Sequence, residues 1–398
     1  MSCKLNDVCE LIVDCPHSTE PDEGEGYPII RTPNIGVGYL DLEGVQRVSK
    51  AAYDRRNIRA VPRPNDLILA REAPAGNVGI IREGMKVCLG QRTVLIRPSA
   101  EKVSPLFLNY YLNAPKQRHA LLSNSNGATV SHVNMPVIRN LVIELPDREA
   151  QDRIADVLSA YDELIENSRR QIQLLEEAAR RLYKEWFIDL KFPGHETTPI
   201  VDGLPEGWCK ATLGELSVLI TRGITPRYSE TSDFLVLGQR CVRGNLVDLS
   251  CARRCERKSI AEQKMLKCGD VLINSTGTGS LGRTAQVWFD PIDMTVDSHV
   301  TIVRASSPEL SSYLAQWAFA NESFIESLHT GSTGQTELPR ERVSSIRVLV
   351  PSSGALNQFN SFVSPMVGKV NMLQRSIAAA REARDRLLPK LMSGEIEV

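Results

Sequence analysis

The chain has 398 residues, of which 42% are hydrophobic and 24% are charged, and its formal net charge is −1. This composition is typical of a globular protein, and the near-zero charge excludes binding of a polyanion through net charge alone. The first ten residues are unlike a signal peptide, and no apolar run approaches the ~20 residues that span a bilayer. With nine cysteines and no secretion signal, we expect reduced thiols and a cytoplasmic protein.

Residues 1–146 read as one mixed domain. Short strand-like runs such as TVLIRP at 93–98 and LVIELP at 141–146 are interspersed with helical patches such as SPLFLNYYLNA at 104–114. The pattern predicts an α+β domain.

Residues 147–190 predict one long helix. No Gly or Pro interrupts the segment, early acids favour its start, and Pro193-Gly194 ends it. Its apolar positions alternate at spacings of four and three, which is the condition for a coiled-coil seam. They are Ile154, Leu158, Tyr161, Ile165, Ser168, Ile172, Leu175, Ala179, Leu182 and Trp186. The alternative is a single amphipathic helix that packs on its own domain.

After a Pro/Gly-rich linker at 191–206, the chain repeats itself. DLILARE at 66–72 matches DVLINS at 270–275, and LGQRTVLIR at 89–97 matches VDSHVTIVR at 296–304. A structural unit of roughly 200 residues therefore occurs twice. We predict a second mixed domain at 207–350.

The glycine-rich stretch INSTGTGSLGRTAQV at 273–287 contains G-x-G-x-x-G, the spacing of dinucleotide-binding turns. The first copy has APAGNVG at the matching place, and the residues after Gly282 alternate like a strand where a dinucleotide fold requires a helix. We predict a turn between antiparallel strands. A dinucleotide-dependent oxidoreductase is the less favoured alternative.

Residues 351–398 predict a second long helix with a similar seam. Its positions are Met366, Val370, Leu373, Ile377, Ala380, Arg384, Leu387 and Leu391. Gly368, Arg384 and Pro389 interrupt the pattern. Because each helix has an apolar face to cover, we expect the two helices to pair with each other as an antiparallel coiled coil.

No catalytic motif is present. The sequence lacks a P-loop, a G-x-S-x-G elbow, an H-E-x-x-H pair and the N-P-P-Y-like tetrapeptide of amino-methyltransferases. Cys241, Cys251, Cys255 and Cys268 are numerous enough for a zinc site, but their spacing is loose and the first copy has no cysteine at the matching positions. We therefore predict free thiols, no metal and no catalytic residue.

Three segments carry a family resemblance. LPEGWCKATLGELSVLITRGITP at 204–226, the long helix with its linker from LPDREAQ to FPGH at 145–195, and REARDRLLPKLMSGEIEV at 381–398 resemble the specificity subunits of Type I restriction-modification systems. The resemblance covers nearly the whole chain, and the order domain, helix, domain, helix matches that family.

The resemblance implies a non-catalytic, DNA-reading scaffold. Each domain would be a target recognition domain that reads one half of a split double-stranded DNA target, and the two helices would set the gap between the halves. The chain itself would bind no cofactor. Two methyltransferase subunits would supply S-adenosylmethionine, and restriction/translocase subunits would use ATP.

Side chains that read bases are mostly Arg, Lys, Asn and Gln, so the candidates come from the basic and amide-rich stretches of both copies. The DNA-binding candidates are Arg31, Asn34, Arg71, Asn77 and Arg92 in the first copy and Gln239, Arg240, Arg243, Arg283 and His299 in the second. For partner binding the candidates are Tyr183, Trp186 and Phe187, with Trp186 alternatively closing the seam between the helices.

One rival function remains open at this stage. A coiled-coil adaptor would use the duplicated domains to bind protein or RNA without DNA sequence specificity.

Overall fold

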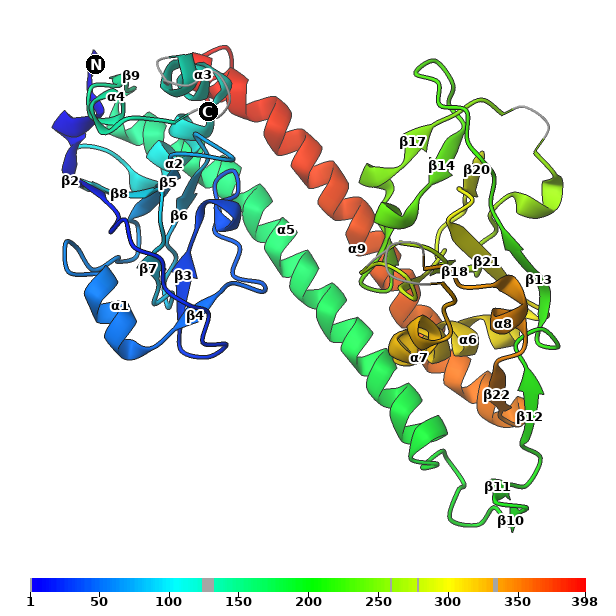
Figure 1. Ribbon diagram of the computed structural model, residues 1–398. Coiled ribbons are helices and arrows are strands. Elements are labelled where there is room, and N and C mark those ends of the chain that lie inside the picture. Colours follow the sequence, from blue (N-terminus) through cyan, green and yellow to red (C-terminus); the bar gives the residue numbers. More distant parts are fainter. Residues whose placement is uncertain (1, 124–131, 258–259, 278, 332–335) are drawn as a thin grey trace. The chain divides into compact units, whose positions relative to one another are not determined.

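The computed structural model describes residues 2–123, 132–257, 260–277, 279–331 and 336–398. It divides into two compact units, each formed by one mixed domain together with parts of both long helices (Figure 1). The first unit comprises Met1–Glu166 and Ile377–Val398, and the second comprises Asn167–Ser376.

The first unit is a mixed α/β structure. Its elements are β1 (Ser2–Lys4), β2 (Cys9–Asp14), β3 (Tyr27–Ile30), β4 (Arg47–Val48), α1 (Lys50–Arg56), β5 (Leu67–Ala70), β6 (Val78–Ile80), β7 (Cys88–Leu89), β8 (Thr93–Pro98), α2 (Pro105–Asn113), α3 (Pro115–Ser123), α4 (Met135–Arg139) and β9 (Val142–Glu144). Two long helices complete it in part, α5 (Arg148–Tyr183) and α9 (Ser353–Ser393).

The central sheet of the first unit has the antiparallel order β2-β8-β5-β6. Successive residues of β5 enter different cores: Leu67 and Leu69 lie in the core with α2, and Ile68 lies in a second core. Both faces of the strand are therefore buried, which explains its continuous apolar run. A second sheet, β4-β3-β7, lies beside it.

The second unit repeats this plan. Its elements are β10 (Ile200–Val201), β11 (Leu204–Pro205), β12 (Cys209–Thr212), β13 (Ser217–Arg222), β14 (Leu235–Leu237), β15 (Val242–Arg243), β16 (Leu246–Val247), β17 (Arg253–Arg254), β18 (Val271–Asn274), β19 (Thr284–Gln286), β20 (Met294–Val296), β21 (Val300–Ala305), α6 (Pro308–Ala320), α7 (Glu322–Ser327), α8 (Arg340–Ser344) and β22 (Arg347–Val350).

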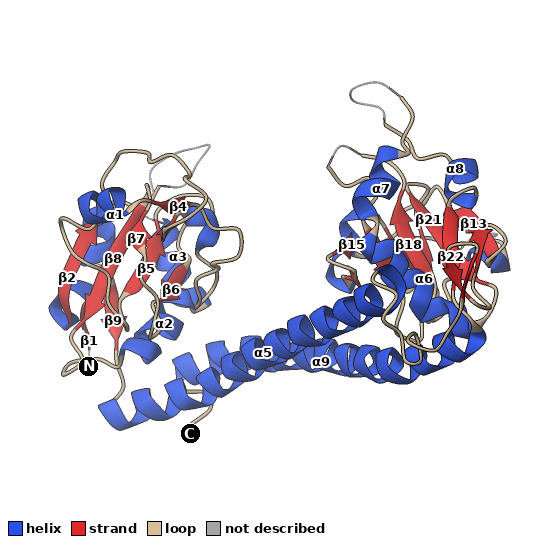
Figure 2. Cartoon of the chain, turned by 90° about the horizontal axis from the view of Figure 1, so that it is seen from below, coloured by secondary structure: helices blue, strands red, loops and turns tan. Residues whose placement is uncertain are grey.

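Its sheets have the orders β13-β21-β18-β19 and β17-β14-β20, which match β2-β8-β5-β6 and β4-β3-β7 strand for strand. Helix α6 packs on β18, β19 and β21, as α2 packs on β6 in the first unit (Figure 2). The duplicated mixed α/β fold is therefore confirmed. The segment 191–206, expected to be a linker, contains the small hairpin β10–β11.

The glycine-rich stretch is a turn between antiparallel strands, as predicted. Strand β18 pairs with β19 from Val271 with Gln286 to Ile273 with Thr284, so a strand follows Gly282. Gly277, Gly279 and Gly282 have φ angles of 93°, 75° and 83°, which a residue with a Cβ rarely adopts. Thr278 lies outside the described residues.

One buried ion pair occurs in the same place in both units. In the first, Arg97 Nε and Nη2 donate to the two carboxylate oxygens of Asp66 at 2.8 and 2.7 Å. In the second, the same atoms of Arg304 donate to Asp270, both at 2.7 Å. Both aspartates are at most 2% exposed at their side chains. The pair joins β8 to the start of β5, and β21 to the start of β18.

Helices α5 and α9 pack side by side with opposite chain directions in each unit (Figure 1). In the first unit Ile154 and Leu158 of α5 share a core with Leu391 of α9. The predicted stripe runs along α5 into the π-helical turn Lys184–Ile188 that follows it, and it is the covered face, since every member is buried or half-buried. Helix α9 runs without a break through Gly368 and Pro389, so the antiparallel coiled coil is confirmed.

The interruption of the seam at Arg384 is compensated within the first unit. Arg384 Nη1 donates to Asp162 Oδ1 at 2.6 Å, and the hydroxyl of Tyr110 donates to Asp162 Oδ2 at 2.6 Å. The cation in the seam is thus paired, and its partner carboxylate is held in turn by α2.

None of the helices in the described ranges is both long and apolar enough to cross a membrane.

A cavity of about 280 Å³ in the second unit is lined by α5, α9 and the domain. Glu176 of α5 lines it together with Trp288, Phe319 and Met366. The Oε1 atom of Glu176 is buried without a hydrogen-bond partner, and burial raises the pKa of this carboxyl to about 7.

We expect the duplicated ion pair to be essential for stability. Arg304→Met leaves the buried Asp270 carboxylate unpaired, which should lower the free energy of unfolding by about 3 kcal/mol. Urea denaturation of the full chain measures the change. Arg340→Met is the matched control, since its pair with Glu341 is exposed and should contribute at most ~1 kcal/mol. Equal losses in the two variants would contradict the assignment.

Glu176 should make stability depend on pH. Between its unfolded pKa of about 4.5 and its folded pKa of about 7, the folded state binds a proton that the unfolded state has released, so stability falls as pH rises through this window. Glu176→Gln should therefore raise Tm more at pH 8 than at pH 5 in thermal denaturation. Glu163→Gln changes an exposed residue of the same helix and should show no such difference. A pH-independent effect of Glu176→Gln would refute the interpretation.

Candidate nucleic-acid interface

Most of the predicted DNA-binding residues lie in turns at the ends of equivalent strands. Strand β3 leads into the 3-10 turn Thr32–Asn34, and β14 leads into the equivalent turn Gln239–Cys241. An equivalent backbone hydrogen bond anchors each turn. Gly90 N donates to Ile30 O at 2.7 Å, and Asp297 N donates to Leu237 O at 2.9 Å.

In the first unit, this turn presents Arg31 at the surface. Arg31 Nη1 donates to Gln46 Oε1 at 2.8 Å, which directs the exposed guanidinium. The Asn34 side chain is half-buried, and its Oδ1 accepts a hydrogen bond from Arg31 N at 3.1 Å. Arg31 is thus available to a ligand, and Asn34 shapes the turn.

In the second unit, Gln239 and His299 come together on Thr276. Gln239 Nε2 donates to Thr276 Oγ1 at 2.8 Å, and the same hydroxyl lies 2.8 Å from His299 Nδ1. His299 is exposed, as are Arg240 and Arg243. Arg240 lies in the turn with Gln239, and Arg243 lies in the hairpin β15–β16 that follows it. Gln239 and His299 thus meet at Thr276, just after β18, and Arg240 and Arg243 are exposed on the chain that follows Gln239.

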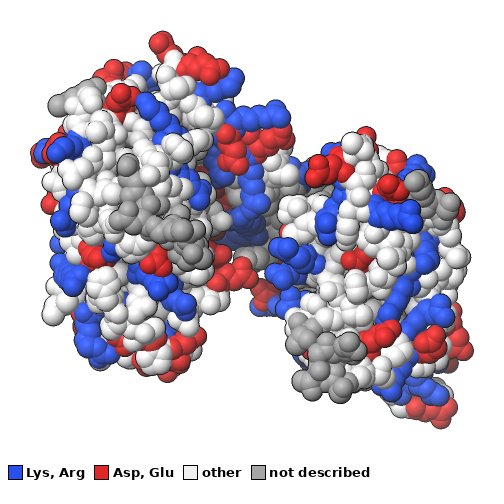
Figure 3. All heavy atoms as spheres, turned by 45° about the horizontal axis from the view of Figure 1, so that its top comes forward, with Lys and Arg blue, Asp and Glu red and all other residues white. Residues whose placement is uncertain are grey.

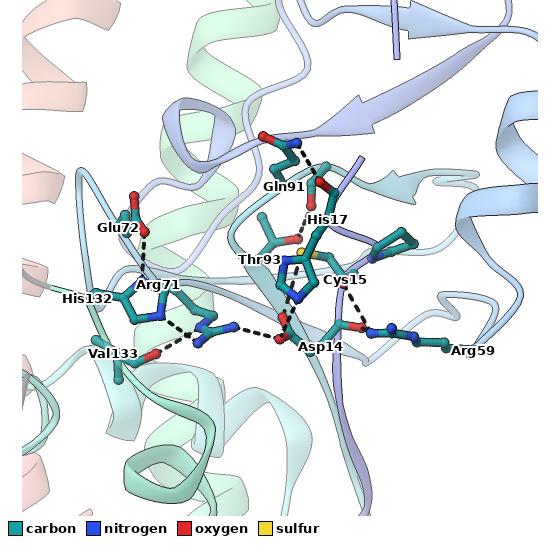
Figure 4. A network of polar contacts seen from close by, with 12 residues as sticks. Asp14, Cys15, His17, Arg59, Arg71, Glu72, Gln91, Thr93, His132 and Val133 are labelled. Atoms are coloured by element: carbon teal, nitrogen blue, oxygen red, sulfur yellow. Dashed lines mark hydrogen bonds and ion pairs between the residues drawn. The ribbon is translucent and has the colours of Figure 1, made fainter. Parts of the chain in front are cut away.

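Arg71 lies in the interior, at the centre of a polar network (Figure 4). Arg71 Nη1 donates to Asp14 Oδ2 at 2.6 Å, Nε donates to Val133 O at 2.8 Å, and Nη2 lies 2.6 Å from His132 Nε2. Because a guanidinium has no acceptor, this His132 nitrogen accepts, and the opposite nitrogen donates to Glu72. Each of the three guanidinium nitrogens of Arg71 therefore has a partner inside the chain.

Arg92 completes the network at the surface. Arg92 Nη1 lies 2.7 Å from Glu72 Oε2, and its side chain is 60% exposed. Arg92 and His299 occupy equivalent positions, because Arg71 N donates to Arg92 O and Ser275 N donates to His299 O, both at 2.8 Å. Glu72 and Thr276 therefore occupy equivalent positions. Glu72 pairs with the exposed Arg92, and Thr276 contacts the exposed His299.

Asn77 and Arg283 are also equivalent, because their carbonyls accept from Ala70 N and Asn274 N at 2.8 and 2.9 Å. The Asn77 side chain is buried, and its Nδ2 donates to Ile35 O at 2.9 Å. Arg283 is half-buried. The interior positions of Arg71 and Asn77 correct the expectation that these two side chains face DNA, since both hold turns together from inside.

The aromatic side chains expected at a partner surface are buried. Tyr183, Trp186 and Phe187 are 4%, 5% and 5% exposed. Phe187 packs on Phe359 of α9 and on Tyr313 of α6, with ring centroids 4.9 Å apart in each case. Trp186 closes the seam, the alternative that the sequence left open. The expectation that Tyr183 and Phe187 face a partner is therefore corrected, because both rings form the core between α5, α9 and α6.

The cysteines are free thiols. Cys241 and Cys255 are buried, Cys251 is half-buried and Cys268 is exposed. Burial raises the pKa of Cys241 to about 11, which keeps this thiol protonated. Among the residues that the structure describes, no three His, Cys, Asp or Glu side chains are grouped as metal ligands.

Sequence reasoning missed the supports of this surface. Asp14, Glu72, His132 and Thr276 were not candidates, because a support is recognised by its partner and not by its local pattern. On the described part of the face in Figure 3, basic and acidic side chains are both scattered over each unit.

Comparison with known proteins matches this architecture. Residues 1–177 match the family model described as a Type I restriction modification DNA specificity domain. The Type I restriction enzyme MjaIX specificity subunit of Methanocaldococcus jannaschii is 27% identical, over 99% of this chain and 93% of that protein. The EcoBI specificity subunit of Escherichia coli is 28% identical, over 36% of this chain and 31% of that protein.

The crystal structure of the S subunit of a Type I restriction-modification system from M. genitalium has the same fold. It superposes with a TM-score of 0.62 at 14% identity, covering 98% of this chain and 95% of that one. Along almost its full length the chain is therefore similar in sequence to a Type I restriction enzyme specificity subunit, and it shares the fold of an S subunit of such a system.

Proposed function

We propose that this chain reads a split DNA target, one half-site for each domain, and carries the subunits that modify and restrict that DNA. The observation that supports this most directly is that the two units share their internal framework and differ in their exposed residues. Their frames are the same down to the Asp66–Arg97 and Asp270–Arg304 pairs. Their exposed strand ends differ, as with Arg92 and His299. Two equal frames with different exposed side chains are what two half-sites of different sequence require.

Six side chains at these ends are the proposed base readers. They are Arg31 and Arg92 in the first unit and Gln239, Arg240, Arg243 and His299 in the second. Arginine fits the acceptor edge of guanine, and glutamine fits adenine, so both units carry chemistry suited to the major groove. Asn34, Arg71, Asn77 and Arg283 are proposed to shape the turns that carry the readers.

The remaining parts of the proposal concern the partners. We propose that the chain is a non-catalytic subunit, as its similarity to specificity subunits suggests. We propose that it acts in the cytoplasm, that α5 and α9 set the gap between the half-sites, and that two methyltransferase subunits dock on exposed faces of these helices. S-adenosylmethionine and ATP would be bound by the methyltransferase and restriction/translocase subunits.

The first test is genome-wide adenine methylation in cells with the gene intact and with the gene deleted. Because the chain alone selects the site, one motif made of two short blocks around a fixed gap should lose its methylation on deletion. Complementation with the gene on a plasmid should restore that motif. If no motif changes while the methyltransferase subunit is expressed, the DNA-reading proposal fails and a protein- or RNA-binding adaptor becomes the better explanation.

A second test separates base contacts from phosphate contacts. Arg240→Ala should weaken binding of the methyltransferase complex to its cognate DNA by about 1–3 kcal/mol and relax one base position. Fluorescence anisotropy with cognate and single-substituted duplexes at several salt concentrations measures both quantities. Arg340→Ala, an exposed arginine of α8, should leave base preference unchanged. A uniform loss with a lower salt slope would make Arg240 a phosphate contact instead.

A further inference from the structure

In each unit one arginine guanidinium donates to a backbone carbonyl at an equivalent position, but the two arginines come from different strands or strand ends. In the first unit Arg71, just after β5, donates from Nε to Val133 O at 2.8 Å. In the second unit Arg222, the last residue of β13, donates from Nη2 to Leu338 O at 2.8 Å. Strand β5 corresponds to β18, and β2 corresponds to β13, so the two arginines are not equivalent.

The carbonyls themselves are equivalent. Val133 N donates to Arg71 O at 3.0 Å, and Leu338 N donates to Ser275 O at 2.8 Å, so each segment is attached to the residue after β5 or β18. Asp14 and Arg222 are equivalent as well, since they pair with Val94 and Thr301, the second residues of β8 and β21.

The basic and acidic residues around the two equivalent carbonyls therefore occupy different positions in the two units. In the first unit an acid, Asp14, ends β2 and the cation follows β5. In the second unit the cation, Arg222, ends β13, a serine follows β18, and the acid is Glu337, whose Oε1 lies 2.6 Å from Arg222 Nη1. What both units retain is a guanidinium that donates to one carbonyl and pairs with one carboxylate.

The clamped segment supports the exposed side chain in both units. In the first, His132 joins Arg71 to Glu72 (Figure 4), and Glu72 also pairs with Arg92. In the second, Glu337 forms a β-bridge with Thr276, whose hydroxyl contacts His299. Loss of the guanidinium would free the segment and, with it, the orientation of Arg92 or His299.

We propose that Arg71 and Arg222 are positioning residues for DNA readout, each specifying one half-site by holding the segment at Val133 or Leu338 without touching a base. This inference rests on the function proposed above. It makes the two arginines different from the exposed readers, because each acts through the residues that it holds.

The experiment uses the full chain co-expressed with its methyltransferase subunit in cells without other adenine methylation, read by genome-wide methylation mapping. Arg71→Ser should relax one block of the motif, raising methylation at singly mismatched sites about tenfold. Arg222→Ser should relax the other block. Arg82→Ser removes an exposed arginine of the first unit and should leave both blocks unchanged.

A rescue variant separates positioning from general stability. Asp14→Arg/Arg71→Ser/His132→Glu rebuilds in the first unit the arrangement of Arg222, Ser275 and Glu337. It should restore discrimination in the block that Arg71→Ser relaxes, with a Tm in thermal denaturation close to that of the unaltered chain.

The outcomes are distinct. General destabilisation would lower methylation at all sites without changing the motif, and that result would overturn the inference. Relaxation of the same block by both single variants, unchanged motifs in both, or a folded triple variant without rescue would also overturn it. If the unaltered chain directs no two-block motif, the proposed function itself fails.

Discussion

The buried guanidinium–carboxylate pair is the constraint on which each domain depends. A carboxylate as buried as Asp66 or Asp270 must be paired, because an isolated buried charge is far less stable than a solvated one. Arg97 and Arg304 each also donate to a backbone carbonyl, of Val61 and Met265, so the pair fixes the chain that enters the central strand. Because the start of that strand is fixed, the residues after its end can differ between the two units while the sheet stays the same.

This division between a fixed start and a variable end would allow one fold to serve the two recognition tasks proposed above. The turns after β3 and β5 and before β8 in the first unit have counterparts after β14 and β18 and before β21 in the second, and equivalent backbone hydrogen bonds anchor them. The side chains on those turns have diverged in type and in charge. Even the clamp on Val133 and Leu338 keeps its geometry while its arginine moves to another strand.

The seam between the helices accommodates a charged side chain because that side chain is paired. Arg384 is accommodated because Asp162 pairs with it and Tyr110 holds Asp162. In the second unit the seam ends in an aromatic core, where Tyr183, Trp186 and Phe187 contact Phe359. These rings belong to the fold, so partner subunits would have to recognise the polar and exposed faces of α5 and α9.

The sequence by itself determined the duplication, the mixed domains, the long helices with their seams and the nature of the glycine-rich turn, because each is encoded by a local period or by direct repetition. It also placed Arg31, Arg92, Arg240, Arg243 and His299 among the candidates that the structure exposes. Only the tertiary structure decided that Arg71 and Asn77 hold turns from inside, that the aromatic residues at the end of α5 are core, and that Asp14, Glu72, His132 and Thr276 support the surface. The physical reason is that a polar side chain takes its role from partners far away in the chain, such as Asp14, 57 residues before Arg71, and no local pattern records them.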